Sequence, residues 1–446
     1  MLFGPFRGWY EIMLPLLIVV SPRWARALGG PQTARCRGIN RLKGVPISVD
    51  HQWRAIKSME LVDSPRDSSS FSGTHLNKVI NVSSSAYYST YYGHTASDLA
   101  VIELALRRRS PRGGLGEGLE TPSLDSQRAR SIVWLLGDSS LDNKVWLSTS
   151  SEESAQALNG FEHVLAPPTM RQDVEYHVNA LFMERKLNTK YACINTAVEA
   201  TSLNDRAFGR LLEQDAFAAR HLQPQDTLVV SLGGNDVALA PLLCTAINML
   251  GLVFCTARQP CMATATTCVP NIYPFVGDCG CLLCGVPGCL VATPLAWPPF
   301  FGYFVDLFKN RIEAYVQRII DRAPNKPRRV VVCTIYYPAE ARQPSWAQAA
   351  LSALRYDVDP KRLQRAIRAI FTHATSKIRL RGVPQVVPLP LYEALNPLDA
   401  DDYVARVEPS AKGGRKIAEA ILEACGMGAP NMQQPHDNTM QRWQKL

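Results

Sequence analysis

The sequence has little of what marks a nucleic-acid-binding or a membrane-spanning protein. Lys and Arg exceed Asp and Glu by 48 to 39, but several of the bases fall in one run, Arg107 to Arg109 with Arg112. Such a run is usually a solvated segment, so we expect no nucleic-acid partner. The N-terminal apolar run, Ile12 to Val20, is shorter than the roughly 20 apolar residues that span a bilayer. Residues 1–27 therefore fit a signal peptide or a shallow anchor, which leaves secreted, membrane-associated and cytoplasmic locations all open.

The chain also lacks the complete ligand spacing of a zinc site. Eight of its twelve cysteines lie between Cys244 and Cys289, in an insertion of about residues 240–300 that is also rich in Pro and Leu. Cys281 and Cys284 form a CxxC pair, but no second pair matches it, so we predict no metal and no cofactor. The apolar flanks of the insertion favour a lid or acyl-binding role and contact with a membrane surface. Disulfides and reduced cysteines both stay open.

The composition is that of one large globular domain with extensions. The chain has 446 residues, of which 46% are hydrophobic and 20% are charged. Residues 28–130 alternate Ser-rich, Gly-rich and Arg-rich stretches without a hydrophobic period, and we expect a mostly irregular extension there. Residues 131–424 form the predicted domain, residues 425–446 are a C-terminal tail, and the oligomeric state stays open.

From Ser131 onward, short apolar runs alternate with helical stretches, as in βα units. The apolar runs are continuous, as is typical of strands covered on both faces. We therefore predict a three-layer α/β/α fold around a five-stranded parallel sheet. The predicted strands are 131–139, 191–198, 227–236, 328–338 and 385–395. The predicted helices are 169–187, 205–221, 301–322, 361–379 and 410–424.

Polar motifs follow the first three predicted strands, at the sheet edge where parallel α/β proteins bind ligands. The first is Gly137-Asp138-Ser139-Ser140-Leu141-Asp142-Asn143, which places Ser139 at the end of a buried strand. The second runs from Asn195 to Thr201, and the third is Gly233-Gly234-Asn235-Asp236. A serine hydroxyl becomes a nucleophile when a base takes its proton and donors hold the resulting oxyanion. Ser139 is the predicted nucleophile.

Together these motifs resemble the SGNH or GDSL hydrolases, esterases and lipases that use a Ser-His-Asp triad on a flavodoxin-like sheet. The resemblance covers 131 to about 424 and implies hydrolysis of a small-molecule or lipid ester. It implies Ser139 as nucleophile, with an oxyanion hole of the Ser139 N–H, the Ala200 N–H and the Asn235 side chain. Gly137, Asp138, Asp142, Asn143, Gly233 and Asp236 would support the motifs. The family usually has glycine where this chain has Ala200, which we expect to be tolerable with a negative φ. The GxSxG elbow of the other common serine-hydrolase fold is absent.

The last block of the family, Asp-x-x-His followed by Pro, is altered. The corresponding segment reads Ala405-Arg406-Val407-Glu408-Pro409, so Ala405 and Glu408 stand where aspartate and histidine would be. No histidine occurs from 374 to 435. A carboxylate has too low a pKa for a base at neutral pH unless burial raises it, and Arg406 would oppose that rise if it folded back.

Three hypotheses follow for the missing base. Glu408 takes the Ser139 proton, directly or through water, with Asp401 or Asp402 assisting. Alternatively, a histidine from elsewhere serves, namely His163 or His177. The third hypothesis is a catalytically weak or inactive protein that keeps the fold for ligand binding or as a scaffold.

Overall fold

The structure is a computed structural model that describes residues 81–107, 129–147, 154–207, 209–239, 243–255, 265–267, 296–298 and 300–428. The predicted signal or anchor segment, most of the C-terminal tail and most of the cysteine-rich insertion, including the CxxC pair, lie outside these residues.

The core is a five-stranded parallel sheet, so the predicted fold class is confirmed. In sheet order the strands are β11 (Gln385–Pro390), β10 (Arg329–Thr334), β7 (Thr227–Ser231), β2 (Ser131–Gly137) and β6 (Tyr191–Asn195). Counted along the chain, this is the order 2-1-3-4-5 of flavodoxin-like sheets. The connections on the two sides of the first strand run in opposite directions. The crevice at that switch point lies beside the end of β2, where Ser139 follows.

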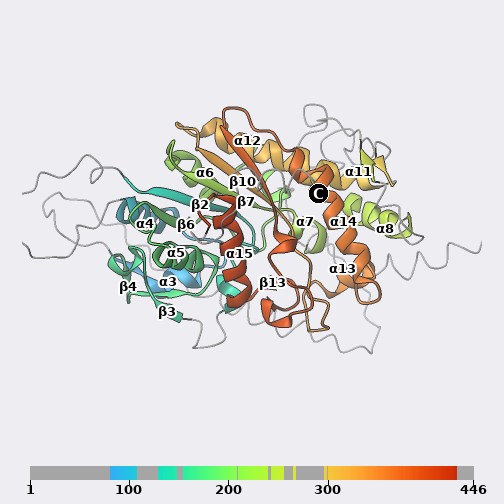
Figure 1. Cartoon of the computed structure of the whole chain (residues 1–446), viewed down its shortest axis with the longest axis horizontal. Coiled ribbons are helices and arrows are strands. Elements are labelled where there is room, and N and C mark those ends of the chain that lie inside the picture. Colours follow the sequence, from blue (N-terminus) through green and yellow to red (C-terminus); the bar gives the residue numbers. More distant parts are fainter. Residues whose placement is uncertain are drawn as a thin grey trace, which may run out of the picture. The chain divides into compact units, whose positions relative to one another are not determined.

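Side chains of each strand alternate between the two faces of the sheet, and both sets are buried. On one face Val133, Leu135, Val229 and Val331 pack against α5 (Val174–Glu184) and α15 (Ala411–Ala424). These two helices lie side by side in front of the sheet in Figure 1. α15 corresponds to the predicted helix 410–424 and presents Ile417, Ile421 and Leu422 to the sheet as one apolar stripe.

The other face is covered by α4 (Ala96–Arg107), α6 (Glu213–His221), α12 (Ile312–Arg322) and α14 (Pro360–His373). α11 (Phe301–Val305) and the π-helical stretch η10 (Asp306–Arg311) lead directly into α12, so that the predicted helix 301–322 is one continuous unit. Trp134 and Leu228 are fully buried on this face. Helices on both faces complete the three layers.

Residues 81–107 depart from the irregular extension that we expected for 28–130. They form β1 (Val82–Ser83), α3 (Ser84–Ser89) and α4. Leu99, Ile102 and Leu106 of α4 are fully buried, at a spacing that repeats on one helical face. Arg107 at the end of α4 binds both carboxylate oxygens of Asp226, at 2.7 and 2.6 Å. This segment therefore packs as part of the α/β domain.

Smaller elements connect the main ones. They are η4 (Lys144–Leu147), β3 (Ser154–Gln156), η6 (Phe161–His163), β4 (Leu165–Ala166), β5 (Thr169–Arg171), η7 (Asn204–Arg206), α7 (Gly234–Ala238), α13 (Gln348–Ala353), η11 (Thr375–Lys377), η12 (Leu391–Glu393), η13 (Ala400–Asp402), β12 (Tyr403–Val404) and β13 (Glu408–Pro409). Of the insertion, α8 (Leu243–Cys255), β8 (Thr266–Thr267) and β9 (Ala296–Trp297) are described. Among the described helices, none combines the length and the apolar character needed to cross a membrane.

Candidate active site

The turn that carries Ser139 depends on a glycine at the end of β2. Gly137 has φ +142°, and a Cβ there would lie 1.8 Å from the carbonyl oxygen of Ser231 on β7. Only glycine permits this close approach of two strands. The Asp138 N–H then donates to Ser231 O at 3.2 Å, and the chain turns at Ser139.

Asp138 fixes the turn from the other side. Its carboxylate accepts hydrogen bonds from the Ser140 N–H at 3.0 Å and from the Ser140 hydroxyl at 2.7 Å. Burial raises the pKa of Asp138 to about 6, and hydrogen bonds from Ser140 oppose the rise. Ser139 is 6% exposed. Ser139 therefore lies nearly closed off from solvent, in a turn that is fixed by the hydrogen bonds between Asp138 and Ser140.

The loop after β6 approaches the same turn. The Val198 N–H donates to Gly137 O at 3.0 Å, which brings Ala200 to the nucleophile turn. Ala200 has φ +54°, so the expected negative φ is wrong. A left-handed conformation costs a non-glycine residue roughly 1–2 kcal/mol, which explains why glycine suits this position. Within the described residues, the N–H groups of Ser139 and Ala200 donate no hydrogen bond.

Asn235 comes to this loop from α7, immediately after β7. Its Nδ2 donates to Thr201 O at 2.9 Å, so one amide hydrogen anchors the loop, and the other has no acceptor among the described residues. Asp236 holds the next part of the same loop, because its carboxylate accepts from the Leu203 N–H at 2.9 Å. Gly233 has φ +108°, and a Cβ there would lie 2.6 Å from the Phe308 ring.

Arg206 connects the end of β2 to the loop that follows β6. Its guanidinium donates to Gly137 O at 3.0 Å and to Ser202 O at 3.1 Å, and it forms a fully buried ion pair with Asp215 at 2.9 Å. One side chain thus fixes the end of β2 and the loop that carries Ala200. No feature of the sequence pointed to this role, because the contacts join residues 69 positions apart.

Asn143 connects the nucleophile turn to the altered last block. Its Nδ2 donates to Pro409 O at 2.9 Å, and its Oδ1 accepts from the Val174 N–H at 3.1 Å. Pro409 and Glu408 form β13, which pairs with β12 across a turn at Ala405 and Arg406. Both turn residues have positive φ. The amide of Asn143 therefore places Glu408 beside the turn of Ser139.

Glu408 is 2% exposed. Its Oε1 accepts a hydrogen bond from Trp346 Nε1 at 3.1 Å, whereas its Oε2 has no hydrogen-bond partner. Desolvation raises the pKa of Glu408 to about 8, and the negative charge of Asp138 adds to the rise. Contacts with the Ser139 hydroxyl and with Trp346 lower this pKa. The contact with Ser139 is looser than a well-formed hydrogen bond, but it brings the two predicted catalytic side chains together.

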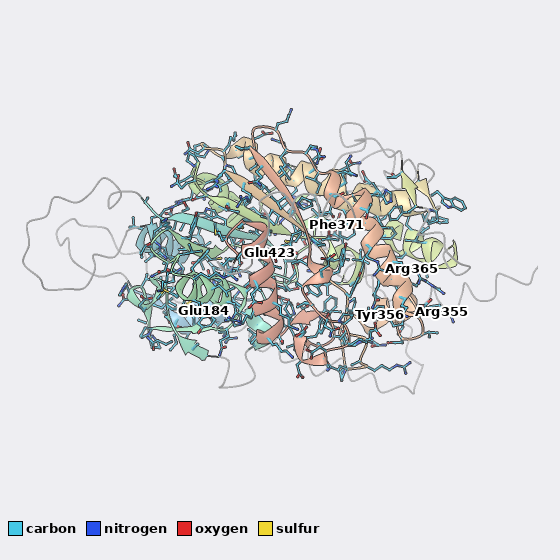
Figure 2. The ribbon with its side chains drawn as sticks, in the orientation of Figure 1. Glu184, Arg355, Tyr356, Arg365, Phe371 and Glu423 are labelled. Atoms are coloured by element: carbon cyan, nitrogen blue, oxygen red, sulfur yellow. The ribbon has the colours of Figure 1, made fainter. Side chains whose placement is uncertain are left out.

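The other charged residues of the last block point elsewhere. Arg406 is fully buried and donates to Asp357 Oδ1 at 2.9 Å, and its guanidinium lies 5.9 Å from the ring of Tyr356. Tyr356, labelled in Figure 2, lies between α13 and α14. Arg406 therefore does not oppose the raised pKa of Glu408. Asp402 is paired with Lys416 at 2.6 Å, and Asp401 is 84% exposed, so neither assists Glu408 directly.

Neither histidine is placed at Ser139. The side chain of His163 is 62% exposed and lies 3.6 Å from Glu162. His177 on α5 is buried, and neither of its ring nitrogens makes a well-formed hydrogen bond with a residue that the structure describes. Burial lowers the pKa of His177 to about 4. Of the ionisable side chains proposed as the base, the structure brings Glu408, and neither His163 nor His177, into contact with the hydroxyl of Ser139.

The solved structures similar to this chain include proteins described as a hydrolase, a lipase and an esterase. No family model and no curated protein matches it. LAE5, an alpha/beta hydrolase from the metagenome of Lake Arreo, Spain, is 14% identical, with 67% of this chain and 95% of that chain covered and a TM-score of 0.30. A putative GDSL-like lipase from Parabacteroides merdae is 12% identical, with 67% and 96% covered and a TM-score of 0.32. Axe2, an acetylxylan esterase from Geobacillus stearothermophilus, is 12% identical, with 68% and 97% covered and a TM-score of 0.32. At these scores the fold assignment rests on the strand order itself.

Two groups at the site had no role in the sequence prediction. Trp346 binds Glu408 across 62 residues of chain. Glu199 lies next to Ala200, is 2% exposed, and accepts a hydrogen bond from Trp146 Nε1 at 3.1 Å. Both indole contacts are long-range, so local sequence patterns carry no signal for them.

An apolar cavity lies close to the candidate oxyanion donors. Val237 of α7, Ile335 after β10, Met249 and Leu252 of α8, and Ile370 of α14 are among its lining residues. Ile335 also packs at Gly234, the residue before Asn235. Among the residues that the structure describes, no group of three or more His, Cys, Asp and Glu side chains is arranged to hold a metal ion.

Proposed function

We propose that this protein hydrolyses carboxylic esters, with Ser139 as nucleophile and Glu408 as its base. The observation that carries the proposal is the buried Glu408 carboxyl in contact with the Ser139 hydroxyl, with its pKa raised to about 8. An effective general base has a pKa near the working pH, and burial brings a carboxylate into that range. At pH 7 about a tenth of Glu408 is then ionised and able to accept a proton.

The reaction follows from this placement. Ser139 Oγ attacks the carbonyl carbon of the ester as its proton passes to the Glu408 carboxylate. The carbonyl oxygen becomes an oxyanion, for which the N–H groups of Ser139 and Ala200 and the free amide hydrogen of Asn235 are the available donors. Collapse breaks the ester bond, and the leaving alkoxide takes the proton from Glu408. Water then attacks the acyl-serine, again giving its proton to Glu408. The proton returns to Ser139, and the acid departs.

The apolar cavity beside Asn235 suits the acyl part of the substrate. Apart from Arg362, its lining consists of aliphatic and aromatic side chains, many of them from α7, α8, α11, η10 and α14, which would exclude water from a hydrocarbon chain. Two of these elements flank the cysteine-rich insertion, for which we keep the proposed lid or acyl-binding role. Contact of the insertion with a membrane surface belongs to the same proposal.

The test is hydrolysis of p-nitrophenyl butyrate by the wild-type chain and by Ser139→Ala. The account expects turnover that falls to the uncatalysed background in Ser139→Ala and persists in Ser89→Ala, an exposed serine of α3. Equal turnover by wild type and Ser139→Ala would contradict it.

A second candidate function is a ligand-binding or scaffold protein that has lost turnover. It is favoured by the placement of both histidines away from Ser139 and by the left-handed backbone of Ala200, which is strained for alanine. Ester binding without any turnover, at pH values up to 9 where Glu408 is ionised, would support this alternative.

A further inference from the structure

Two buried glutamates, Glu199 and Glu408, flank the nucleophile turn in matching surroundings. Each is 2% exposed. Each offers its Oε1 to the indole N–H of a tryptophan at 3.1 Å, from Trp146 in one case and from Trp346 in the other. In the part of the chain that the structure describes, the Oε2 atom of each has no well-formed hydrogen-bond partner.

Two adjacent residues of the nucleophile turn hold this arrangement. The Glu199 N–H donates to Asp142 Oδ2 at 3.2 Å, and Asn143 donates to Pro409 O, next to Glu408, at 2.9 Å. The two glutamates are therefore anchored to adjacent residues of the same turn. Their proximity has an electrostatic consequence, because burial and then the charge of Glu408 raise the pKa of Glu199 well above its usual range.

Among the described residues, the one cation that acts on these two glutamates is Lys144, whose charge lowers the pKa of Glu199. Lys144 binds both carboxylate oxygens of Asp142, at 2.5 and 2.6 Å, and so forms a buried pair of its own. The other titratable groups that act on Glu408 and Glu199 are Asp138 and Asp142, both acidic, and Tyr336 lies close enough to sense the two glutamates. Two uncompensated buried carboxylates would be strongly unfavourable. One proton on the pair removes one of these charges.

We propose that, once Glu408 is ionised, Glu199 and Glu408 share the one proton that remains, and that Glu199 is the positioning residue that holds it while Glu408 acts on Ser139. This inference rests on the proposed function and adds a second acid to it. Glu408 loses its proton first, and Glu199 keeps its own and donates to Glu408 Oε2. The ionised form of Glu408 is then stabilised by two donors, Trp346 and Glu199. Proton transfer from Ser139 moves one proton onto Glu408, and its return to the leaving alkoxide restores the pair.

The test is the sign of a shift in the Glu408 titration. Glu199→Leu removes the donor without leaving a charge, so the midpoint should rise by roughly one pH unit or more, the size expected for a lost hydrogen bond to a charged group. Glu199→Gln retains an N–H donor, and its midpoint should return toward the wild-type value. Glu184→Leu, which replaces a partly exposed glutamate of α5, should leave the midpoint in place.

Two readouts separate this inference from the proposed function. One is the pH dependence of Ser139 labelling by a fluorophosphonate. The other readout needs no activity and is the fluorescence of Trp346 as a function of pH. It is obtained by subtracting, from the tryptophan fluorescence of each protein, that of the same protein carrying Trp346→Phe. An upward fluorescence shift in Glu199→Leu without any labelling of the wild type would support the shared proton and overturn the hydrolase. A downward shift, as expected if Glu199 carries a second negative charge, or no shift, would overturn the shared proton even if Ser139 is labelled.

Discussion

Trp346→Phe should move the pH profile of Ser139 labelling upward. The indole N–H of Trp346 lies 3.1 Å from Glu408 Oε1, and this hydrogen bond lowers the pKa of Glu408. A hydrogen bond to a charged group contributes roughly 1.5–3 kcal/mol, and each pKa unit corresponds to about 1.4 kcal/mol. Its loss should raise the pKa of Glu408 from about 8 by roughly one to two units.

The assay is the rate of fluorophosphonate labelling between pH 5 and 10. Because only ionised Glu408 accepts the Ser139 proton, the wild-type rate should rise with pH to a midpoint near 8 and level off above it. At pH 7.5 the Trp346→Phe rate should be lower by roughly tenfold or more, and it should recover at high pH. Trp297→Phe makes the same change at an exposed tryptophan and should leave the midpoint unmoved. An unchanged or lowered midpoint in Trp346→Phe would refute the reasoning.

Three further predictions concern the surroundings of the site. Ala200→Gly should raise the free energy of unfolding by up to about 1 kcal/mol, because glycine relieves the positive φ. The control Ala197→Gly should lower the free energy of unfolding. If urea denaturation shows that both variants lose the same free energy of unfolding, the left-handed turn at Ala200 is contradicted. Arg206→Met should lower the free energy of unfolding by roughly 3–5 kcal/mol, because it leaves the buried carboxylate of Asp215 without its ion-pair partner. Arg381→Met, at the exposed surface, should change the free energy of unfolding by less than about 0.5 kcal/mol. Calorimetry of both variants tests this difference. The wild-type melting temperature should fall as the pH rises from about 6.5 to about 8.5, since folded Glu408 keeps its proton up to about pH 8 and the unfolded chain does not. Buried histidines with lowered pKa values oppose this trend only below about pH 6.5. Glu408→Gln should make the fall in melting temperature smaller. A wild-type melting temperature that rises over this pH range would contradict the raised pKa of Glu408.

The fold was predictable because its signals are local and strong. All five strands are continuous apolar runs, and each observed strand lies within its predicted range. Ser139 and Asn235 could be assigned to one sheet edge for the same reason, since both follow strands of a parallel sheet. α4 carries an equally regular pattern at Leu99, Ile102 and Leu106. It lies among Ser-rich and Arg-rich stretches, and the composition of those stretches was the basis for predicting that 28–130 is mostly irregular.

The details of the site depend on contacts between distant parts of the chain. The sign of φ at Ala200 is set by the hydrogen bonds of its loop to β2 and α7, which no local pattern encodes. Trp346 and Arg206 act across 62 and 69 residues. The sequence placed Glu408 where the SGNH and GDSL hydrolases have histidine, but its raised pKa arises from burial that only the assembled fold provides.

The account depends most on activation of Ser139 by Glu408. The most direct measurement is the rate at which a fluorophosphonate forms an adduct on Ser139, located by peptide mass spectrometry, in the wild type and in Glu408→Gln at pH 8.5. The account predicts an adduct on Ser139 that forms on the order of 10²- to 10⁴-fold more slowly in Glu408→Gln, the usual contribution of a general base. Equal rates in the two proteins, or no adduct on Ser139 in the wild type, would contradict it.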